Sequence, residues 1–245
     1  MLNMADTTFS LVLPTYNERD NIKIFIPQLI ETCKRWDIEI IIVDDGSDDG
    51  TIEEIKKIQD YFKNINLIQR ESLSGIGSAL IDGYNSAKGK YIISCDSDMS
   101  FLADDIKKIG EMLLTDTYDL VIGSRYLSGS YYEAPNLKIL QKKIISKLGN
   151  IFLRFINRIP THDFSANCRG IKNSVWKKLR VKNKNNFMLF ETIWRAHQMN
   201  LVIKELPVRF LDRKFGSSKL KSGREVARSL ILFLKLKFEK DETHY

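Results

Sequence analysis

The stretch IEIIIVDDGSDDGT, residues 38–51, shows the pattern that recurs through the first half of the chain. An apolar run typical of a buried strand ends in acidic and glycine residues, and helical spacing of apolar residues begins near Thr51. Similar apolar runs occupy residues 9–14, 65–69, 90–95 and 119–124, and helical patterns occupy residues 21–36, 78–87 and 104–114. This alternation predicts an α/β fold with a mostly parallel, doubly wound sheet sandwiched by helices.

Polar loops follow four of the five predicted strands. They read PTYNE (14–18), DDGSDDGT (44–51), DSDMS (96–100) and GSRY (123–126). The carboxyl ends of parallel strands open on one rim of a doubly wound sheet, and ligands bind at that rim. We therefore expect the four loops to build one site.

Two carboxylates stand close together in IISCDSDMSF, residues 92–101. Strand alternation puts Asp96 and Asp98 on the same side, where like charges are unfavourable unless a cation joins them. Such a pair can hold Mg²⁺ or Mn²⁺ and leave coordination positions for phosphates, and Ser100 adds a hydroxyl. Chance alone supplies roughly one Asp-x-Asp in a chain of this length, so the prediction depends on the position at the rim.

Neighbouring turns have structural explanations as well. Asp48 or Asp49 is predicted to cap the helix that begins near Thr51. Asp44 and Asp45 stand nearer the strand end, where a carboxylate can accept hydrogen bonds from a ribose or a base. The sequence GIGSAL lacks the third glycine of a dinucleotide fingerprint, so residues 75–77 are predicted to form a tight strand-to-helix turn.

Taken in order, PTYNE, VDDGSDDGT, GIGSAL, CDSDMS, GSRY and RKFGSSKL resemble the motifs of family 2 glycosyltransferases of the GT-A (Rossmann-like) fold. Within that family the chain resembles the dolichol-phosphate and polyprenyl-phosphate mannosyltransferases over about residues 9–220. The resemblance implies metal-dependent, inverting transfer of a hexose to a polyprenyl or dolichyl phosphate, most often mannose from GDP-mannose. The alternatives are another donor, UDP-glucose or UDP-GlcNAc, or a saccharide acceptor in surface polysaccharide assembly.

The same resemblance implies roles for individual residues. Asp98 and Arg125 would be catalytic. The nucleotide sugar would be bound by Pro14, Tyr16, Glu18, Asp45, Asp96, Arg213 and Lys219. The metal, Mg²⁺ or Mn²⁺, would be held by Asp96, Asp98 and Ser100. The acceptor phosphate would be contacted by Arg125, Lys142 and Ser146.

One motif departs from the family. Where the family often has Asp-x-Thr-Ser-Gly-Phe-Arg, the chain reads DFSANCR at residues 163–169. Asp163 and Arg169 are kept, and Asn167 is expected to replace glycine at a positive φ. A lipid monophosphate has a second pKa of about 6, so it is largely ionised and already a nucleophile. No strong general base is needed, and the three histidines have no predicted role.

Composition and two basic segments suggest where the protein works. The 245 residues include 38 Lys and Arg against 31 Asp and Glu, a net charge of +7 that favours anionic partners. No signal peptide or membrane span is evident, and the three cysteines lack metal-type spacing. Apolar-basic patterns at 137–156 and 225–239 are typical of helices at a membrane interface, although the first could instead pack on the core.

We therefore expect a GT-A domain at residues 1–215 and a basic, apolar helical tail at 216–245 that contacts a membrane surface or a membrane partner subunit. The expected location is cytoplasmic, at the cytoplasmic face of a membrane. A sugar-nucleotide pyrophosphorylase is disfavoured, because PTYNE replaces its basic glycine-rich loop. A receiver domain would carry its acidic pair after strand one, whereas here the acidic pairs follow strands two and four. Nucleic-acid binding would need aromatic residues interleaved with the basic ones, and the sequence shows no such pattern.

Overall fold

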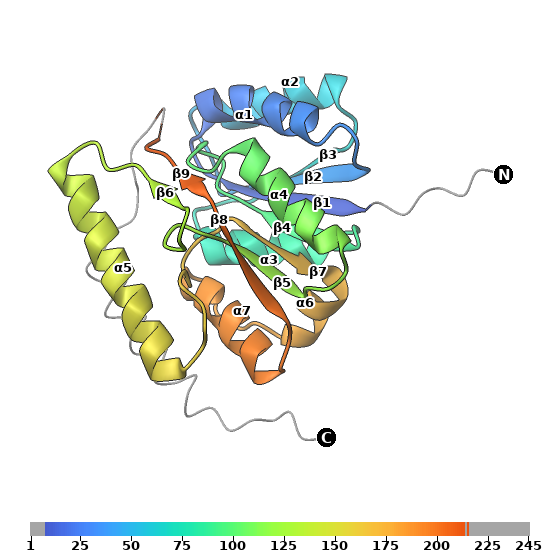
Figure 1. Cartoon of the computed structure of the whole chain (residues 1–245). Coiled ribbons are helices and arrows are strands. Elements are labelled where there is room, and N and C mark those ends of the chain that lie inside the picture. The colour runs from blue at the N-terminus through green and yellow to red at the C-terminus, as the bar shows by residue number, and fades with distance from the viewer. Residues whose placement is uncertain (1–7, 214, 216–245) are drawn as a thin grey trace. The chain divides into compact units, whose positions relative to one another are not determined.

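A seven-stranded sheet forms the centre of the computed structural model, which describes residues 8–213 and 215 (Figure 1). The strand order is β3-β2-β1-β4-β7-β5-β8. The strands are β1 (Phe9–Thr15), β2 (Ile38–Asp44), β3 (Ile65–Gln69), β4 (Tyr91–Ser94), β5 (Leu120–Ser124), β7 (Arg169–Lys172) and β8 (Ile203–Pro207). Every neighbouring pair is parallel except the two pairs that β7 makes with β4 and β5. The predicted α/β class, the mostly parallel sheet and the five strands of the first half are confirmed.

Helices cover both faces of this sheet (Figure 1). The helices are α1 (Arg19–Thr32), α2 (Thr51–Tyr61), α3 (Ile76–Ser86), α4 (Ala103–Leu114), α6 (Asn173–Leu179) and α7 (Phe187–Gln198). α1 contacts α2 and α4 on one face, whereas α3, α6 and α7 contact one another on the other. Each buries an apolar stripe at helical spacing, as with Ile106, Ile109 and Leu113 of α4.

The core is packed closely where α3 crosses the sheet. A Cβ built on Gly83 of α3 would lie 2.4 Å from Cγ1 of Val12 and 3.2 Å from Cγ2 of Val43. Only a glycine lets the helix approach β1 and β2 this closely. This contact fixes the position of the N-terminus of α3 at the rim of the sheet, beside the loops that follow β1 and β2.

A small second sheet lies beyond the rim. β6 (Tyr131–Tyr132) pairs in parallel with β9 (Arg209–Phe210), and Phe101 forms an isolated bridge with Phe210. The small sheet thus joins the loop after β5, the loop after β4 and the segment after β8. It brings residues more than 100 positions apart in the sequence to one place.

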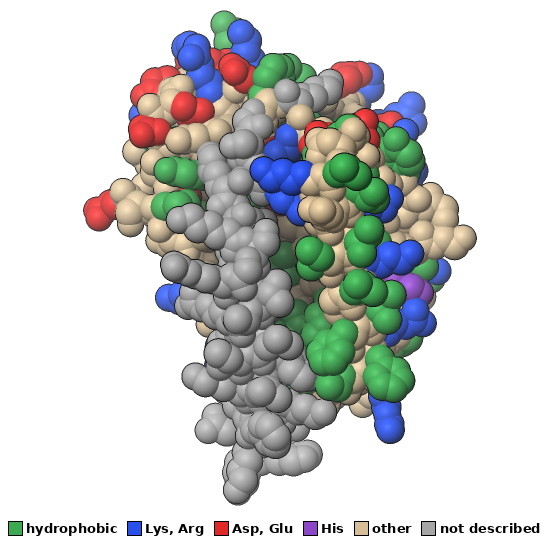
Figure 2. Space-filling model, turned by 90° about the vertical axis from the view of Figure 1, so that its left-hand side faces the viewer, with side chains coloured by type: hydrophobic (Ala, Val, Ile, Leu, Met, Phe, Trp, Pro, Cys, Tyr) green, Lys and Arg blue, Asp and Glu red, His purple; other side chains and the backbone are tan. Residues whose placement is uncertain are grey.

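Helix α5 (Leu137–Asn157) follows β6 and turns its apolar stripe outward. The side chain of Asn136 accepts the Ile139 amide and caps the helix. Leu137 is 77% exposed and Phe155 is 85% exposed, whereas the buried residue of this helix is Asn150. The alternative that this stripe packs on the core is therefore wrong, whereas contact with a membrane interface stays a prediction. Figure 2 shows apolar side chains in a column with Lys and Arg beside it. Among the described residues, no helix is both long enough and apolar enough to cross a membrane.

Lys219, the predicted helix at 225–239 and the rest of the tail from residue 216 lie outside the described residues. The domain boundary at residue 215 and the role of the tail stay predictions.

Candidate functional site

The loops after β1, β2 and β4 meet at one rim, as the sequence predicts. The Asn17 amide donates to Oγ of Ser47 at 2.8 Å, and Nδ2 of Asn17 donates to Asp48 at 2.8 Å. Oγ of Ser97 donates to the carbonyl of Pro14 at 3.0 Å. These hydrogen bonds tie PTYNE to both acidic loops, so residues from three separate turns form a single surface.

The predicted capping residues of α2 have different roles. The cap position itself is Gly50, in the left-handed region at a φ of 89°. The Asp49 carboxylate accepts the amides of Thr51 and Arg19, which satisfies one first-turn donor of α2 and lowers the pKa of Asp49 against the opposing effect of burial. Asp48 instead bonds to Asn17. The prediction that Asp48 or Asp49 caps the helix is therefore wrong, because Gly50 is the cap residue and Asp49 only accepts the first helical amide from the position before it.

A cluster of charges stands at the end of β4. Nε of Arg213 lies 2.8 Å from Oδ2 of Asp98, and its Nη1 lies 3.7 Å from Oε1 of Glu18. Oδ1 of Asp98 also accepts the amide of Ser100 at 3.0 Å and its hydroxyl at 2.6 Å. Glu18, Asp98, Ser100 and Arg213 are four residues predicted for the donor and metal site, and the structure brings them together.

Asp96 belongs to the same cluster. Its Oδ1 accepts Nδ2 of Asn167 at 2.9 Å, and Oδ1 of Asn167 in turn accepts the buried hydroxyl of Ser94. Burial and the charge of Asp98 raise the pKa of Asp96 to about 6, against the opposing effects of Asn167, Arg213 and Arg125. The repulsion between the two carboxylates predicted from the sequence is therefore present in the folded protein.

Asn167 itself corrects an expectation. The motif suggested that Asn167 replaces a glycine at positive φ, but Asn167 is not among the described residues that have one. Its amide instead connects Ser94 to Asp96. Because it is a polar residue beside a carboxylate at the rim, Asn167 is a site residue that the sequence reasoning missed.

The donor atoms at this rim suit a cation shared with a ligand. Among residues 8–213, no group of three or more His, Cys, Asp or Glu side chains is arranged to hold a metal ion. Asp98 is 3% exposed and Asp96 is partly buried, and both supply the hard oxygen ligands that Mg²⁺ and Mn²⁺ prefer. Mg²⁺ is commonly bound through one or two carboxylates together with substrate phosphates. The residues present fit that arrangement.

Asp45 is engaged on the side of the rim near α3. Its Oδ1 lies 3.0 Å from Nη1 of Arg70, and its Oδ2 accepts the amides of Ser74 and Gly75 at 3.1 and 2.8 Å. Asp44 accepts the amides of the following turn. Asp45 therefore holds the start of α3, and its predicted contact with the nucleoside stays a prediction.

The predicted tight turn before α3 is confirmed. Gly75 caps the helix at a φ of 93°. A Cβ on Gly77 would lie 2.0 Å from the carbonyl oxygen of Asn185, so the loop before α7 crosses directly over this turn. Residues 75–77 and Asn185 thus form a wall beside Asp45.

Arg125 stands in an aromatic cage defined by Tyr126, Tyr132 and Phe210. Its Cζ lies 5.4, 5.9 and 5.2 Å from the three ring centroids, respectively. The cage exists because the small sheet brings Tyr132 and Phe210 beside the end of β5. Cations over aromatic faces are stabilised by the ring quadrupole, so the cage favours a fixed, charged guanidinium.

Asp163 forms a bidentate ion pair with Arg125. Oδ2 of Asp163 lies 2.7 Å from Nε, and Oδ1 lies 2.9 Å from Nη2. Burial disfavours the charged form of both groups, but their attraction to each other has the larger effect. As a result, Asp163 raises the pKa of Arg125, and Arg125 lowers the pKa of Asp163. Both groups are therefore charged at neutral pH.

The inner side of α5 carries the other predicted acceptor residues. Ser146 is partly buried and lies near the hydroxyl of Tyr126, whose pKa burial raises to about 12. Lys142 is partly buried and makes no hydrogen bond or ion pair with another described residue. Its neighbour Lys143 donates to the carbonyl of Tyr132 at 3.0 Å and lies 5.2 Å from that ring. Lys143 is a second cation beside the cage, and the sequence reasoning missed it.

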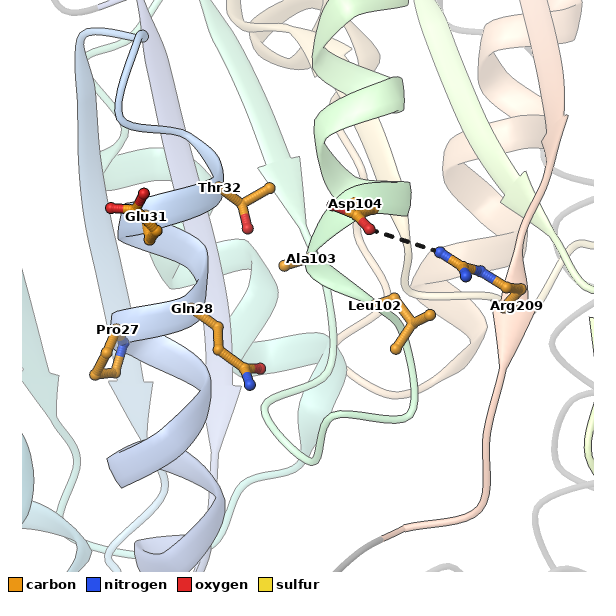
Figure 3. A pocket seen from close by; sticks show the side chains of 8 residues that line it. All are labelled: Pro27, Gln28, Glu31, Thr32, Leu102, Ala103, Asp104 and Arg209. Carbon is orange, nitrogen blue, oxygen red and sulfur yellow. Dashed lines mark ion pairs between the residues drawn. The ribbon is translucent and has the colours of Figure 1, made fainter.

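A hollow of about 510 Å³ lies apart from these residues, between α1 and α4 (Figure 3). Across it, Nη2 of Arg209 faces Oδ2 of Asp104 at 3.8 Å. It is lined by Pro27, Gln28, Glu31, Thr32, Leu102, Ala103, Asp104 and Arg209. None of these is a predicted site residue, so the hollow is not the site assembled at the rim.

Comparison with known proteins agrees with this geometry. The model of glycosyl transferase family 2 matches residues 10–180. Polyprenol monophosphomannose synthase of Mycolicibacterium smegmatis is 27% identical over 228 residues, which cover 90% of this chain and 83% of that protein. Dolichol-phosphate mannosyltransferase of Pyrococcus furiosus is 29% identical over 215 residues, 86% of this chain but only 59% of that protein.

Solved structures share the fold at low sequence identity. Glucosyl-3-phosphoglycerate synthase from Mycobacterium tuberculosis, in complex with Mn²⁺, UDP and glucosyl-3-phosphoglycerate, has a TM-score of 0.67 and 17% identity over 94% of this chain and 78% of that one. S. aureus TarS in complex with UDP-GlcNAc has a TM-score of 0.64 and 17% identity over 96% of this chain and 67% of that one. These neighbours show the GT-A fold.

Proposed function

Because the chain belongs to glycosyl transferase family 2, we propose that it transfers mannose from GDP-mannose to a polyprenyl phosphate. The enzyme class follows from the family. The donor sugar, the nucleotide and the lipid acceptor are our proposal, and the names of the two mannosyl-transferring relatives support them. The observation that carries the proposal is the pairing of two separate ionic centres on one rim: the carboxylates Asp96 and Asp98 with Arg213, and the caged Arg125.

The first centre suits the donor. Asp96 and Asp98 would hold Mg²⁺ or Mn²⁺ together with Ser100, and the bound cation would neutralise charge on the departing diphosphate. Arg213 lies 29% exposed beside Asp98 and offers a planar group of donors that matches phosphate oxygens. On the same rim, Glu18 lies beside Arg213 and Asp45 lies beside the start of α3. We propose that the nucleoside binds between them, in contact with Pro14 and Tyr16.

The second centre suits the acceptor. A lipid monophosphate is largely ionised at neutral pH and needs no base to become a nucleophile, but it must approach an anionic donor. Arg125 supplies a charge fixed by Asp163 and by the rings around it, and Lys142, Lys143 and Ser146 stand on the adjoining face of α5. Direct attack by the phosphate on the anomeric carbon inverts that carbon.

Helix α5 gives the acceptor a route from a bilayer. Its polar side carries Lys143 and Ser146 beside the cage, and its apolar side is exposed at Leu148, Ile151 and Phe155. Interfacial helices bind membranes through such an apolar face flanked by cations, which anionic headgroups attract. We place α5 at the surface of the membrane, with the lipid phosphate on its inner side. This would make the enzyme peripheral at the cytoplasmic face.

The test is direct transfer by the purified full-length protein. Labelled GDP-mannose, UDP-glucose and UDP-GlcNAc are each incubated with a polyprenyl phosphate and Mn²⁺ or Mg²⁺, and the organic phase is counted. We expect label in lipid from GDP-mannose, none with EDTA, and an anomeric configuration opposite to that of the donor. Arg125→Ala should leave only a small residual rate of lipid formation, whereas Arg209→Ala, which removes a nearby cation outside both centres, should keep the wild-type rate. Transfer to a saccharide with no lipid product from any donor would refute the acceptor assignment.

A further inference from the structure

Within residues 8–213, one nitrogen of the Arg125 guanidinium has no hydrogen-bond partner, and the direction of that nitrogen is set by other residues. Its Nε and Nη2 are bonded to Asp163, and Nη2 also lies 2.7 Å from Oγ of Ser165. Nη1 makes no hydrogen bond with another described residue. Because the guanidinium is planar, fixing two of its nitrogens fixes the direction of the third. An incoming phosphate would therefore meet Nη1 at a place decided by Asp163.

Asp163 is in turn held by its surroundings. It is fully buried, and its carboxylate accepts the amides of Arg125, Ser165 and Ala166 at 3.1 Å each. These amides lie on the loops after β5 and before β7. The position of the carboxylate thus depends on how the short segment 161–163 is placed against the sheet.

Glu205 of β8 places that segment. Its Oε1 accepts the amide of His162 at 2.8 Å and the amide of Asp163 at 3.1 Å, and its Oε2 lies 2.7 Å from Nδ1 of His162. The side chain of Glu205 is only 8% exposed. One carboxylate oxygen on the edge strand therefore fixes the backbone at the residue that holds Arg125.

We propose that Glu205 is a positioning residue for the acceptor phosphate, acting through Asp163 on Arg125. The inference rests on the proposed role of Arg125. The amides of His162 and Asp163 donate to the same oxygen of Glu205. Glu205 therefore positions the segment as a hydrogen-bond acceptor, and this role does not require its negative charge. A glutamine keeps that oxygen and presents Nε2 to the imidazole, whereas a methionine of similar length removes the acceptor and leaves both amides unpaired.

The substitutions test this distinction. Glu205→Met should lower kcat/KM for the polyprenyl phosphate by about 10²-fold, the effect expected when a reacting group is displaced by about 1 Å, and leave the KM for the nucleotide sugar unchanged. The kcat/KM of Glu205→Gln should stay within about 3-fold of wild type, because the glutamine keeps the oxygen that accepts both amides. In an Arg125→Ala background, Glu205→Met should add almost nothing, because the residue through which it acts is gone.

Glu39 offers a matched control. It is also a buried carboxylate on a strand, and it accepts the hydroxyl of Ser10 and the amide of Lys88. Its strand, β2, lies between β1 and β3 and far from β8 in the strand order. Glu39→Met should lower stability without a selective loss of acceptor use. Equal losses in the Arg125→Ala and wild-type backgrounds, or a Glu205→Gln enzyme as impaired as Glu205→Met, would overturn the proposal.

A readout without the reaction separates this inference from the proposed function. The Nε–H resonance of Arg125, assigned with Arg125→Lys, should exchange with water slowly in wild type and in Glu205→Gln but fast in Glu205→Met. Glu205→Ala serves as a second variant if Glu205→Met does not fold. A wild-type protein that makes no mannosyl lipid would refute the proposed function, while unchanged Nε–H exchange in Glu205→Met would refute the positioning role.

Discussion

Replacing Asp98 by asparagine should separate activity from stability. The substitution keeps the shape of the side chain and one acceptor oxygen, so the hydrogen bonds from Ser100 can remain. It removes one of the two negative charges proposed to hold the divalent cation. Metal ions contribute several kcal/mol of charge stabilisation in transfers of this kind, and 1.36 kcal/mol corresponds to a tenfold change in rate. We therefore expect kcat/KM to fall at least about 100-fold.

Stability should hardly change, because two effects oppose each other. The pKa of Asp96, about 6 against an ordinary 3.8, represents at most about 3 kcal/mol of unfavourable free energy at neutral pH. Burial causes more of it than Asp98 does, so relief of the repulsion is worth on the order of 1 kcal/mol. The lost ion pair with the part-exposed Arg213 costs about as much. The free energy of unfolding should stay within about 1 kcal/mol of wild type.

The assay combines initial rates over a range of Mn²⁺ concentrations with urea unfolding of the metal-free protein. Asp105→Asn is the matched control, since Asp105 is a buried carboxylate that accepts the amide of Arg209 outside the predicted site. This control should lose stability but keep its metal dependence. Near-normal turnover of Asp98→Asn would refute the metal role, and a large loss of stability would refute the idea that the two carboxylates repel each other.

Three further outcomes are expected. Because the folded protein holds a proton on Asp96 up to about pH 6, whereas the unfolded chain loses it near pH 4, protonated Asp96 adds to stability fully below about pH 4. The free energy of unfolding of the metal-free protein should therefore fall as pH rises from about 4 through about 6, and Mn²⁺ should abolish that fall. A free energy of unfolding that stays constant over about pH 4–7 without metal, measured with urea, would contradict the raised pKa. Ile151→Glu on the exposed face of α5 should reduce sedimentation with anionic liposomes without lowering Tm; unchanged sedimentation would remove α5 from the membrane contact. Gly83→Ala should destabilise the fold by about 1–3 kcal/mol through overpacking against Val12, measured by urea unfolding, and a neutral result would show that α3 can shift.

The first half of the fold could be predicted because each strand is a mostly apolar run and the helices between the strands carry apolar residues at helical spacing. The rim followed from topology, and the cluster of Glu18, Asp96, Asp98 and Arg213 confirms that the loops converge. β7 was not predicted, because its four residues, RGIK, are too few to show a period and their antiparallel pairing has no local signal. Strand pairing across 70 or more residues is decided by the tertiary structure.

Three details of the site were beyond sequence reasoning for the same reason. The pattern of α5 defines two faces but cannot say which one faces the body of the protein, and the structure turns the polar one inward. Lys143 stands beside Lys142, and only the position of Tyr132 decides which of them meets the ring. Glu205 looks like one more charge in an extended segment until its contacts with the loop before β7 are known.

The place of β7 has a consequence for how the chain folds. β4 and β5 are not neighbours, because residues 169–172 lie between them in the sheet. A ribosome that has made both strands has not yet supplied the segment that pairs with each of them. Two unpaired strand edges would then wait for the intervening residues, and exposed edges recruit other chains. Fragments that stop before Arg169 should therefore aggregate, and formation of β7 is a step at which a chaperone would improve the yield of this enzyme.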